Sequence, residues 1–161
     1  MLHLIIDGYN YINRIQAPRI SGPYHLELVR KDFLEKLALY KRKKQTHITV
    51  VFDAYRGNSL NRQWETYKGI TIIYSKMHET ADEIIIERIH ERKAGTVVVS
   101  SDRAIIDEAK RCGIPFITPI KLNEAMKYAE ENKGETKPML KGNPKKLPKK
   151  LRKSLRAVEK I

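Results

Sequence analysis

Four aspartates stand at the ends or beginnings of predicted elements in this sequence, and their side chains suit metal chemistry. Asp7, Asp53 and Asp102 follow short apolar runs, and Asp82 lies in the first turn of a predicted helix. Strand ends at one edge of an open parallel sheet face a common crevice, so we expect the four carboxylates to converge. Converging carboxylates repel and raise one another's pKa unless a cation joins them. The pattern therefore predicts a site for a hard divalent ion, Mg²⁺ or Mn²⁺, with oxygen ligands.

The four positions differ in how readily a structural role explains them. Asp82 and Asp102 each suit a helix start, because a carboxylate there caps free N–H groups and complements the helix dipole. Asp7 and Asp53 gain nothing from packing, and both follow a buried strand, so they are the strongest candidates. Asn10, three residues after Asp7, is expected to add a neutral oxygen or to fix a water. Three further acids are more typical of caps, helix surfaces or supporting positions: Glu79, Glu83 and Asp107.

The chemistry that such a site favours is phosphodiester hydrolysis, in which divalent ions bind the phosphate, activate water and stabilise the leaving oxygen. Other enzyme classes fit less well. Position 9 is Tyr, where an aspartyl phosphatase usually has a second Asp, and no aromatic sugar platform supports a glycosidase. The five histidines show no H-E-x-x-H spacing. The single cysteine, Cys112, has no local base or partner motif, so we expect a buried or half-buried thiol rather than a nucleophile.

Apolar segments that alternate along the chain predict the elements that position these residues. We expect strands at 2–6, 47–52, 70–74, 96–99 and 115–118, and helices at 24–44, 80–92, 101–112 and 122–132. Residues 55–69 show no regular spacing of apolar residues and are predicted to form a loop. Thr80 and Glu83 fit a capping box at a helix start. Strands alternating with helices predict an α/β fold, with a central, mainly parallel sheet and helices on both faces.

Positive charge is concentrated at the C-terminal end. The 161 residues carry a net charge of +13, and residues 133–161 supply nine of these charges, with eleven Lys or Arg against two Glu. We therefore predict a domain at 1–132 and a basic tail at 133–161 that ends in a short helix after Pro148. Beside a carboxylate crevice, this tail favours nucleic acid as the partner; a solubilising tail is the alternative. Its candidate phosphate contacts are Lys145, Lys146, Lys149, Lys150, Arg152 and Lys153.

Aromatic and basic residues are interleaved in the segment 55–69, directly after Asp53. Aromatic stacking combined with cationic contacts is a common way to hold single-stranded RNA. An equally common use of such residues is to pack a loop onto a sheet, and the sequence leaves both interpretations open. The candidates for RNA binding in this segment are Arg56, Arg62, Trp64, Tyr67 and Lys68.

Four short motifs, taken in order, resemble those of the YacP-like branch of the NYN domains, relatives of the PIN nucleases. They are Asp7-Gly8-Tyr9-Asn10, Phe52-Asp53-Ala54, Thr80-Ala81-Asp82 and Ser100-Ser101-Asp102-Arg103. The resemblance covers about residues 1–130 and implies a PIN-like three-layer sandwich. It also implies a metal-dependent ribonuclease in which the four aspartates are the acidic positions and Asn10 matches the family's asparagine. Some members of this branch resemble ribosome-associated endoribonucleases acting on messenger RNA, which makes the ribosome a further expected partner.

Two other functions stay open from the sequence. One is a non-catalytic RNA- or ribosome-binding module on a nuclease-like fold, and the other is a flap-type DNA nuclease. No apolar run approaches the ~20 residues that span a bilayer, and the first residues lack the basic segment of a signal peptide. With one cysteine the chain forms no internal disulfide. We therefore expect a cytoplasmic protein with no membrane partner.

Overall fold

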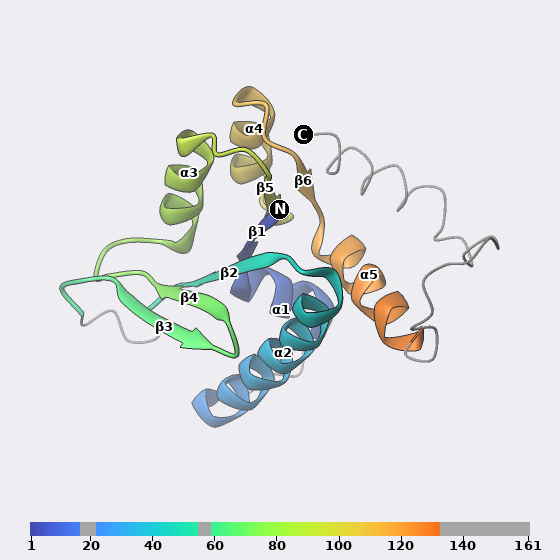
Figure 1. Cartoon of the computed structure of the whole chain (residues 1–161). Coiled ribbons are helices and arrows are strands. Elements are labelled where there is room, and N and C mark those ends of the chain that lie inside the picture. Colours follow the sequence, from blue (N-terminus) through green and yellow to red (C-terminus); the bar gives the residue numbers. More distant parts are fainter. Residues whose placement is uncertain (17–21, 55–58, 133–161) are drawn as a thin grey trace.

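A six-stranded sheet forms the centre of the molecule, in the order β3-β4-β2-β1-β5-β6 (Figure 1). The computed structural model describes residues 1–16, 22–54 and 59–132. β1 pairs in parallel with both β2 and β5, and only β3 runs antiparallel to its neighbour. The strands are β1 (His3–Asp7), β2 (His47–Phe52), β3 (Gln63–Tyr67), β4 (Ile70–Tyr74), β5 (Thr96–Val99) and β6 (Phe116–Ile117).

Five helices cover the two faces of this sheet. α1, α2 and α5 lie on one face, and α3 and α4 lie on the other (Figure 1). Within the described residues, no helix is both long and apolar enough to cross a membrane. This arrangement is the PIN-like α/β sandwich that the sequence predicted. The helices are α1 (Gly8–Gln16), α2 (Gly22–Lys44), α3 (Ala81–Glu91), α4 (Arg103–Arg111) and α5 (Pro119–Glu131).

The apolar runs of the central strands supply the core. β5 is buried along its whole length, as expected for a parallel strand that has helices on both faces. One core cluster joins the sheet to α1, α2 and α5 through residues such as Phe33 and Leu37. A second cluster joins the opposite face to α3 and α4 through Ile84, Ile85 and Ile105. Burial on both faces fixes the register of the strands, and therefore the position of the residues that follow them.

Three elements differ from the sequence prediction. Residues 63–67, predicted as part of a loop, form the antiparallel edge strand β3. Four of its five residues are exposed, so no alternation of buried and polar positions marks it in the sequence. The segment directly after Asp7, where the sequence predicted neither helix nor strand, forms α1, which buries Tyr11 and Ile12. α5 also begins at Pro119, three residues before the predicted start, because Thr118 caps it and proline suits a first helical position.

Gly8 starts α1 for a packing reason. A Cβ atom at this position would overlap the ring of Phe52, the last residue of β2. The φ of Gly8 is not among the positive values of the described residues, so a left-handed backbone is not the reason for glycine here. The missing side chain instead lets α1 begin directly after Asp7, close against β2.

Candidate active site

The carboxyl ends of β2, β1 and β5 lie side by side, because the three strands are parallel neighbours. Asp7 is the last residue of β1, Asp53 directly follows β2, and Asp102 follows β5 after two serines. The first turn of α3 is tied to the same edge, since the backbone N–H of Ala81 donates to Oδ1 of Asp53 at 2.7 Å. Asp82 comes next in the chain. The fold therefore gathers the four predicted aspartates at one edge of the sheet.

Asp7 is the most buried of these acids, with 6% of its surface exposed. The Ser100 hydroxyl donates to its Oδ2 at 3.3 Å, and the Asn10 backbone N–H also donates to the carboxylate. These bonds favour the charged form. Burial opposes it more strongly, and the negative charges of Asp82 and Asp53 add to the effect, so the pKa of Asp7 rises to about 7. Asp7 is thus a carboxyl group that ionises with difficulty in the absence of a cation.

Asp82 shares this electrostatic environment. Its pKa is raised first by partial burial and then by the charges of Asp102, Asp53 and Glu83. Within the described part of the chain, no group donates a hydrogen bond to its carboxylate. Asp53, in contrast, is exposed and accepts the Ala81 N–H. Partly buried carboxylate oxygens without donors, beside other carboxylates, are suited to a bound cation.

Asp102 is held in place by a network that reaches Asp7. It is the N-cap of α4, and its Oδ1 accepts the N–H groups of Ala104 and Ile105 at 2.9 and 3.2 Å. Its own N–H donates to the Ser100 hydroxyl at 3.0 Å, the same hydroxyl that donates to Asp7. Asp102 is therefore an N-cap, as anticipated. The cap bonds hold its carboxylate beside the other aspartates, so the capping role and a role in the site are compatible.

Asn10 reaches this network from α1. Its side-chain oxygen accepts both the N–H and the hydroxyl of Ser101, at 2.9 and 3.0 Å. In this geometry Asn10 positions the turn between β5 and α4, and its role as a neutral ligand oxygen or as a group that fixes a water stays a prediction. Ser100 and Ser101 belong to the site for the same reason. The run Ser100-Ser101-Asp102 after a buried strand was the signal in the sequence that pointed to them.

The donor set fits a magnesium-class ion with water in its shell. In the described residues, no three of the four aspartates bring ligand oxygens within 4.8 Å of one another. Mg²⁺ usually binds one or two carboxylates and keeps several waters, so it needs no closed cage of protein ligands. Asp7, Asp53, Asp82 and Asp102 are all oxygen donors, which Mg²⁺ and Mn²⁺ prefer.

A half-buried arginine lies near the same strand ends, on the face covered by α2. Arg30 donates to the Tyr9 hydroxyl at 3.2 Å, and its guanidinium carbon lies 5.6 Å from the ring centre of Tyr74 and 5.8 Å from that of Phe52. Phe52 and Tyr74 end β2 and β4. Among the described residues, no carboxylate forms a salt bridge with Arg30. Sequence reasoning missed this residue because it looks like any charged position on an amphipathic helix.

A sequence profile of the YacP-like NYN domain matches residues 4–161, almost the whole chain. The chain belongs to the YacP-like NYN domain family. NYN domains have a nuclease-like fold, so the gathered aspartates lie on a scaffold that suits phosphodiester chemistry. A comparison with curated proteins finds no significant sequence match.

Two solved structures resemble this NYN domain closely in fold. The crystal structure of Rae1 (YacP) from Bacillus subtilis superposes with a TM-score of 0.63 at 26% identity, covering 82% of this chain and 77% of the other. The W164L mutant of the same protein superposes with a TM-score of 0.69 at 24% identity, with coverages of 82% and 79%. The agreement extends across most of both chains and supports the domain's architecture.

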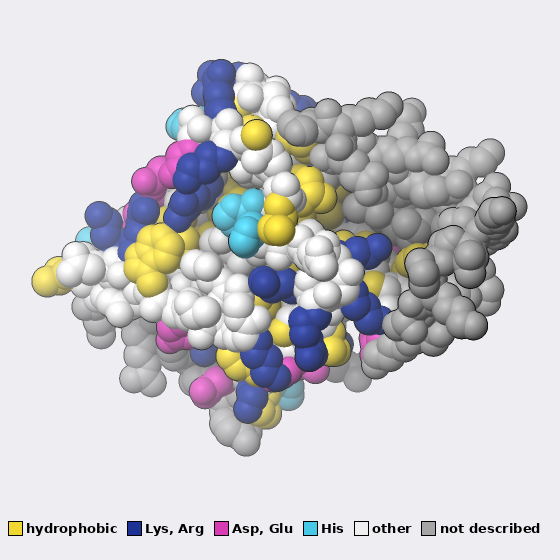
Figure 2. Space-filling model, in the orientation of Figure 1, with side chains coloured by type: hydrophobic (Ala, Val, Ile, Leu, Met, Phe, Trp, Pro, Cys, Tyr) yellow, Lys and Arg dark blue, Asp and Glu magenta, His cyan; other side chains and the backbone are white. Residues whose placement is uncertain are grey.

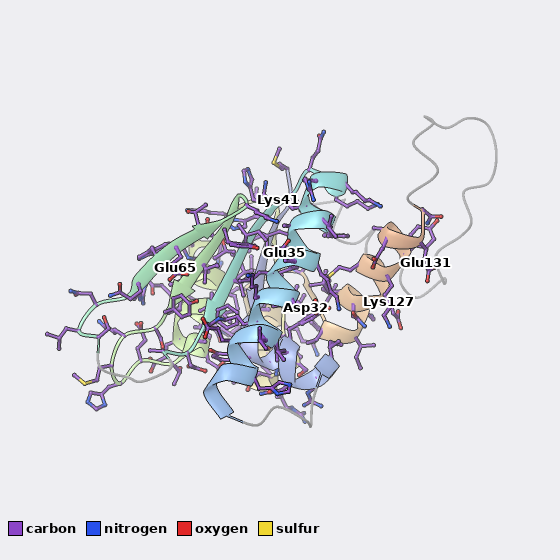
Figure 3. The ribbon with its side chains drawn as sticks, turned by 90° about the horizontal axis from the view of Figure 1, so that it is seen from below. Asp32, Glu35, Lys41, Glu65, Lys127 and Glu131 are labelled. Carbon is purple, nitrogen blue, oxygen red and sulfur yellow. The ribbon has the colours of Figure 1, made fainter. Side chains whose placement is uncertain are left out.

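The basic residues predicted to bind RNA are partly engaged in ion pairs. Arg62 donates to Glu79 at 2.8 Å and to Glu87 at 2.6 Å, and hydrogen bonding to Arg62 lowers the pKa of Glu79. Lys68 pairs with Glu35 at 2.8 Å, and the Tyr67 hydroxyl also donates to Glu35. Glu35 lies on the side of α2 that faces the β3–β4 hairpin (Figure 3). These contacts fasten the hairpin to α2 and α3.

Trp64, unlike the ion-paired Arg62 and Lys68, presents much of its side chain to solvent, with 55% of its surface exposed. The guanidinium of Arg88, on α3, lies 5.6 Å from the centre of its ring. Figure 2 shows dark blue Lys and Arg side chains over α3 beside a large hydrophobic side chain on the hairpin. Trp64 therefore remains a candidate stacking platform in the NYN domain. Arg56 and the predicted tail residues, Lys145 through Lys153, lie outside the described residues.

The three supporting acids have structural partners of their own. Glu79 pairs with Arg62, and Asp107 lies 4.0 Å from Arg103. Glu83 completes the capping box at the start of α3, where its side chain accepts the Thr80 N–H. The candidate site is thus composed of the four aspartates rather than of these neighbouring acids.

Proposed function

We propose that this NYN domain is a divalent-metal-dependent endoribonuclease that hydrolyses RNA phosphodiester bonds. The observation that carries the proposal is Asp7, a buried carboxyl group at a strand end whose pKa is raised to about 7 by burial and by neighbouring acids. Keeping such a group among other carboxylates is costly for folding, and cost of this kind is concentrated at functional sites.

The chain's own residues have distinct parts in the proposed mechanism. A bound Mg²⁺ or Mn²⁺ would supply positive charge that polarises a phosphate and activates water. Asp7, Asp53, Asp82 and Asp102 would hold this ion. Ser100 orients Asp7, and the Ala81 N–H orients Asp53.

Substrate binding would use groups on both sides of the aspartates. Arg30 offers a cation that forms no salt bridge within the described residues, although Glu27 contributes to its electrostatic environment, and it lies close to the ends of β2 and β4. We assign it to a backbone phosphate next to the one that is cleaved, because arginine binds phosphate through a planar set of donors. The exposed ring of Trp64 would stack on an unpaired base. The basic tail would add phosphate contacts that do not depend on sequence.

The central test is cleavage of a labelled single-stranded RNA by purified wild type, Asp7→Asn and Asp53→Asn. We expect both variants to lose at least about 100-fold in rate, as is usual when a group that stabilises transition-state charge is removed. Asp107→Asn is the matched control, because its carboxylate is exposed and pairs with Arg103 away from the crevice. Excess chelator should abolish activity, and Mg²⁺ or Mn²⁺ should restore it. Full activity in either variant or in chelator would refute the metal mechanism.

The same experiment separates the alternatives. RNA binding without cleavage under any metal condition would indicate a non-catalytic module. Faster cleavage of a DNA flap than of single-stranded RNA would indicate a DNA nuclease. The finer proposal, that the substrate is messenger RNA on the ribosome, predicts that Asp7→Asn co-sediments with ribosomes at moderate salt. If the variant stays in the supernatant, the ribosomal part of the proposal fails while the ribonuclease part stands.

A further inference from the structure

A second group of potential metal ligands lies on α3 and α4, away from the strand ends. It contains His90 in the last turn of α3, Glu108 in α4, and Cys112, the C-cap of α4. One ligand atom from each residue lies within 4.8 Å of the other two, and this is the only such trio within the described residues. His90 Nε2 lies 2.6 Å from Glu108 Oε1, and Cys112 Sγ lies 3.8 Å from the same oxygen.

We propose that His90, Glu108 and Cys112 form a binding site for a divalent transition metal of the zinc class, which joins α3 to α4. The site is independent of the nuclease function proposed above. It uses one nitrogen, one oxygen and one sulfur atom, a set that suits borderline-soft Zn²⁺ rather than Mg²⁺. The aspartate crevice, with oxygen donors only, has the opposite preference.

The geometry needs only small side-chain movements. Tetrahedral zinc with ordinary bond lengths places its ligand atoms about 3.3–3.7 Å apart. Cys112 and Glu108 are already close to this spacing, because residues four apart lie on the same face of a helix. His90 and Glu108 would have to move apart by less than about 1 Å, measured against the same bond lengths. His90 is half exposed, so its ring has room to turn.

Two exposed arginines would compete with a metal for these ligands. Arg111 donates to Glu108 Oε1 through both Nε and Nη2, and its Nε also reaches Oε2. A metal on Oε1 would displace the Nη2 contact and leave the contact between Nε and Oε2. The side chain of Arg111 is 61% exposed, and ion pairs this exposed contribute little to stability. Arg92 donates to Cys112 Sγ at 3.7 Å, a long contact from an exposed side chain. Solvent would supply the fourth ligand.

Binding would have a defined proton balance and a structural effect. His90 would bind as the neutral imidazole, Glu108 as the carboxylate, and Cys112 as the thiolate after its proton passes to the buffer. The C-terminal turn of α3 would then be linked to the end of α4. The same two helices start at the crevice with Asp82 and Asp102. An eleven-residue helix is about 16 Å long, so the metal would stabilise the helix pair without touching the aspartates.

Cobalt substitution tests the site directly, because the chain has a single cysteine. Metal-free full-length protein is titrated with Co²⁺, and a thiolate-to-cobalt charge-transfer band in the near ultraviolet is expected at one equivalent. This band can come only from Cys112. Zn²⁺ should displace the cobalt and raise the thermal midpoint, and binding should release protons in a weakly buffered solution.

Variants identify the ligands. Cys112→Ser should remove the band, and both Cys112→Ser and His90→Gln should weaken Zn²⁺ binding at least about tenfold. His25→Gln is the control for histidine, since His25 is exposed on α2, and Asp7→Asn with Asp53→Asn is the control for the crevice; both should bind zinc like wild type. Unchanged zinc affinity in Cys112→Ser would overturn the proposal. So would loss of binding in the crevice variant, or a zinc-bridged dimer by analytical ultracentrifugation, which would place the metal between two chains.

Discussion

At the scale of single residues, the site contains charged groups that folding partly removes from water. Asp7 is buried and surrounded by like charges, Asp82 has a carboxylate without hydrogen-bond donors in the described residues, and Arg30 lies among aromatic rings. The placement of the two acids costs stability in the free protein, whereas Arg30 keeps favourable contacts with the rings. Each of the three groups would gain from a ligand of the opposite charge, a cation for the acids and a phosphate for the arginine. Stability and binding are therefore coupled at these positions.

The raised pKa of Asp7 makes the stability of metal-free protein depend on pH. The folded form binds its proton more tightly than the unfolded chain, where the pKa is 3.8, because the folded value is about 7. The contribution to stability is therefore full below about pH 4 and is lost as the pH rises to about 7. In chelator at pH 8, Asp7→Asn should be more stable than wild type, by up to about 4 kcal/mol.

Urea denaturation at several pH values measures this difference. The stability advantage of Asp7→Asn over wild type should shrink as the pH falls toward 4, because wild-type Asp7 then becomes neutral. Added Mg²⁺ should stabilise wild type more than the variant. A gain that is the same at pH 5 and pH 8 would show that ionisation of Asp7 is not its source.

Arg30 gives a prediction about substrate rather than about metal. Arg30→Met keeps the apolar stem over Phe52 and Tyr74 but removes the charge. We expect weaker RNA binding, with KM raised about 10–150-fold, since a charge-assisted bond to phosphate is worth about 1.5–3 kcal/mol. Arg42→Met, at an exposed position of the same helix, is the control. Equal effects of the two substitutions would indicate general electrostatics rather than a specific phosphate contact.

At the scale of elements, helix starts and strand ends set the geometry of the crevice. Three of the four aspartates follow parallel strands, and the fourth lies at the start of a helix that is fastened to Asp53. The capping box at Thr80 and Glu83 was predicted correctly because both partners are local in sequence. β3 was missed because it is an exposed edge strand that is defined by pairing with β4 rather than by its own pattern.

The capping box should be important for both stability and activity. Thr80→Ala removes the side-chain oxygen that accepts the Glu83 N–H. We expect a loss of about 0.5–2 kcal/mol in the free energy of unfolding, the usual cost of losing a cap. Activity should fall more than stability alone explains, because Asp82 lies in this first turn. Thr80→Ser keeps an oxygen and should restore most of both properties; failure to do so would point to the methyl group instead of the cap.

At the scale of the whole molecule, positive charge is unevenly distributed along the chain, with an excess in residues 133–161, the predicted basic tail. The acids of the crevice repel a phosphate backbone, so attraction for RNA must come from elsewhere. The tail holds nine of the thirteen net positive charges. Its contribution should be long-range, insensitive to RNA sequence and sensitive to salt.

Removal of residues 133–161 should therefore weaken RNA binding and flatten its dependence on salt, because fewer counterions are released. The slope of log affinity against log salt concentration, measured by fluorescence anisotropy, reports the number of phosphates neutralised. Cleavage of a short RNA at saturating concentration should change little, since the aspartates remain. An unchanged slope would return the tail to a solubilising role.

The amino-acid pattern alone was enough to predict the strand ends that carry the acids, the alternation that gives a parallel sheet, and the family. Hydrophobic runs and helix caps are local, so Asp7, Asp53, Asp82 and Asp102 could be singled out without coordinates. Only the tertiary structure decided the contacts between distant segments. It joined Asn10 to Ser101, placed Arg30 against Phe52 and Tyr74, and tied Arg62 to Glu79. It also brought His90 to Glu108 and Cys112, where the sequence showed no ligand spacing. Such contacts depend on how helices pack against the sheet, and packing has no short-range signature in the chain.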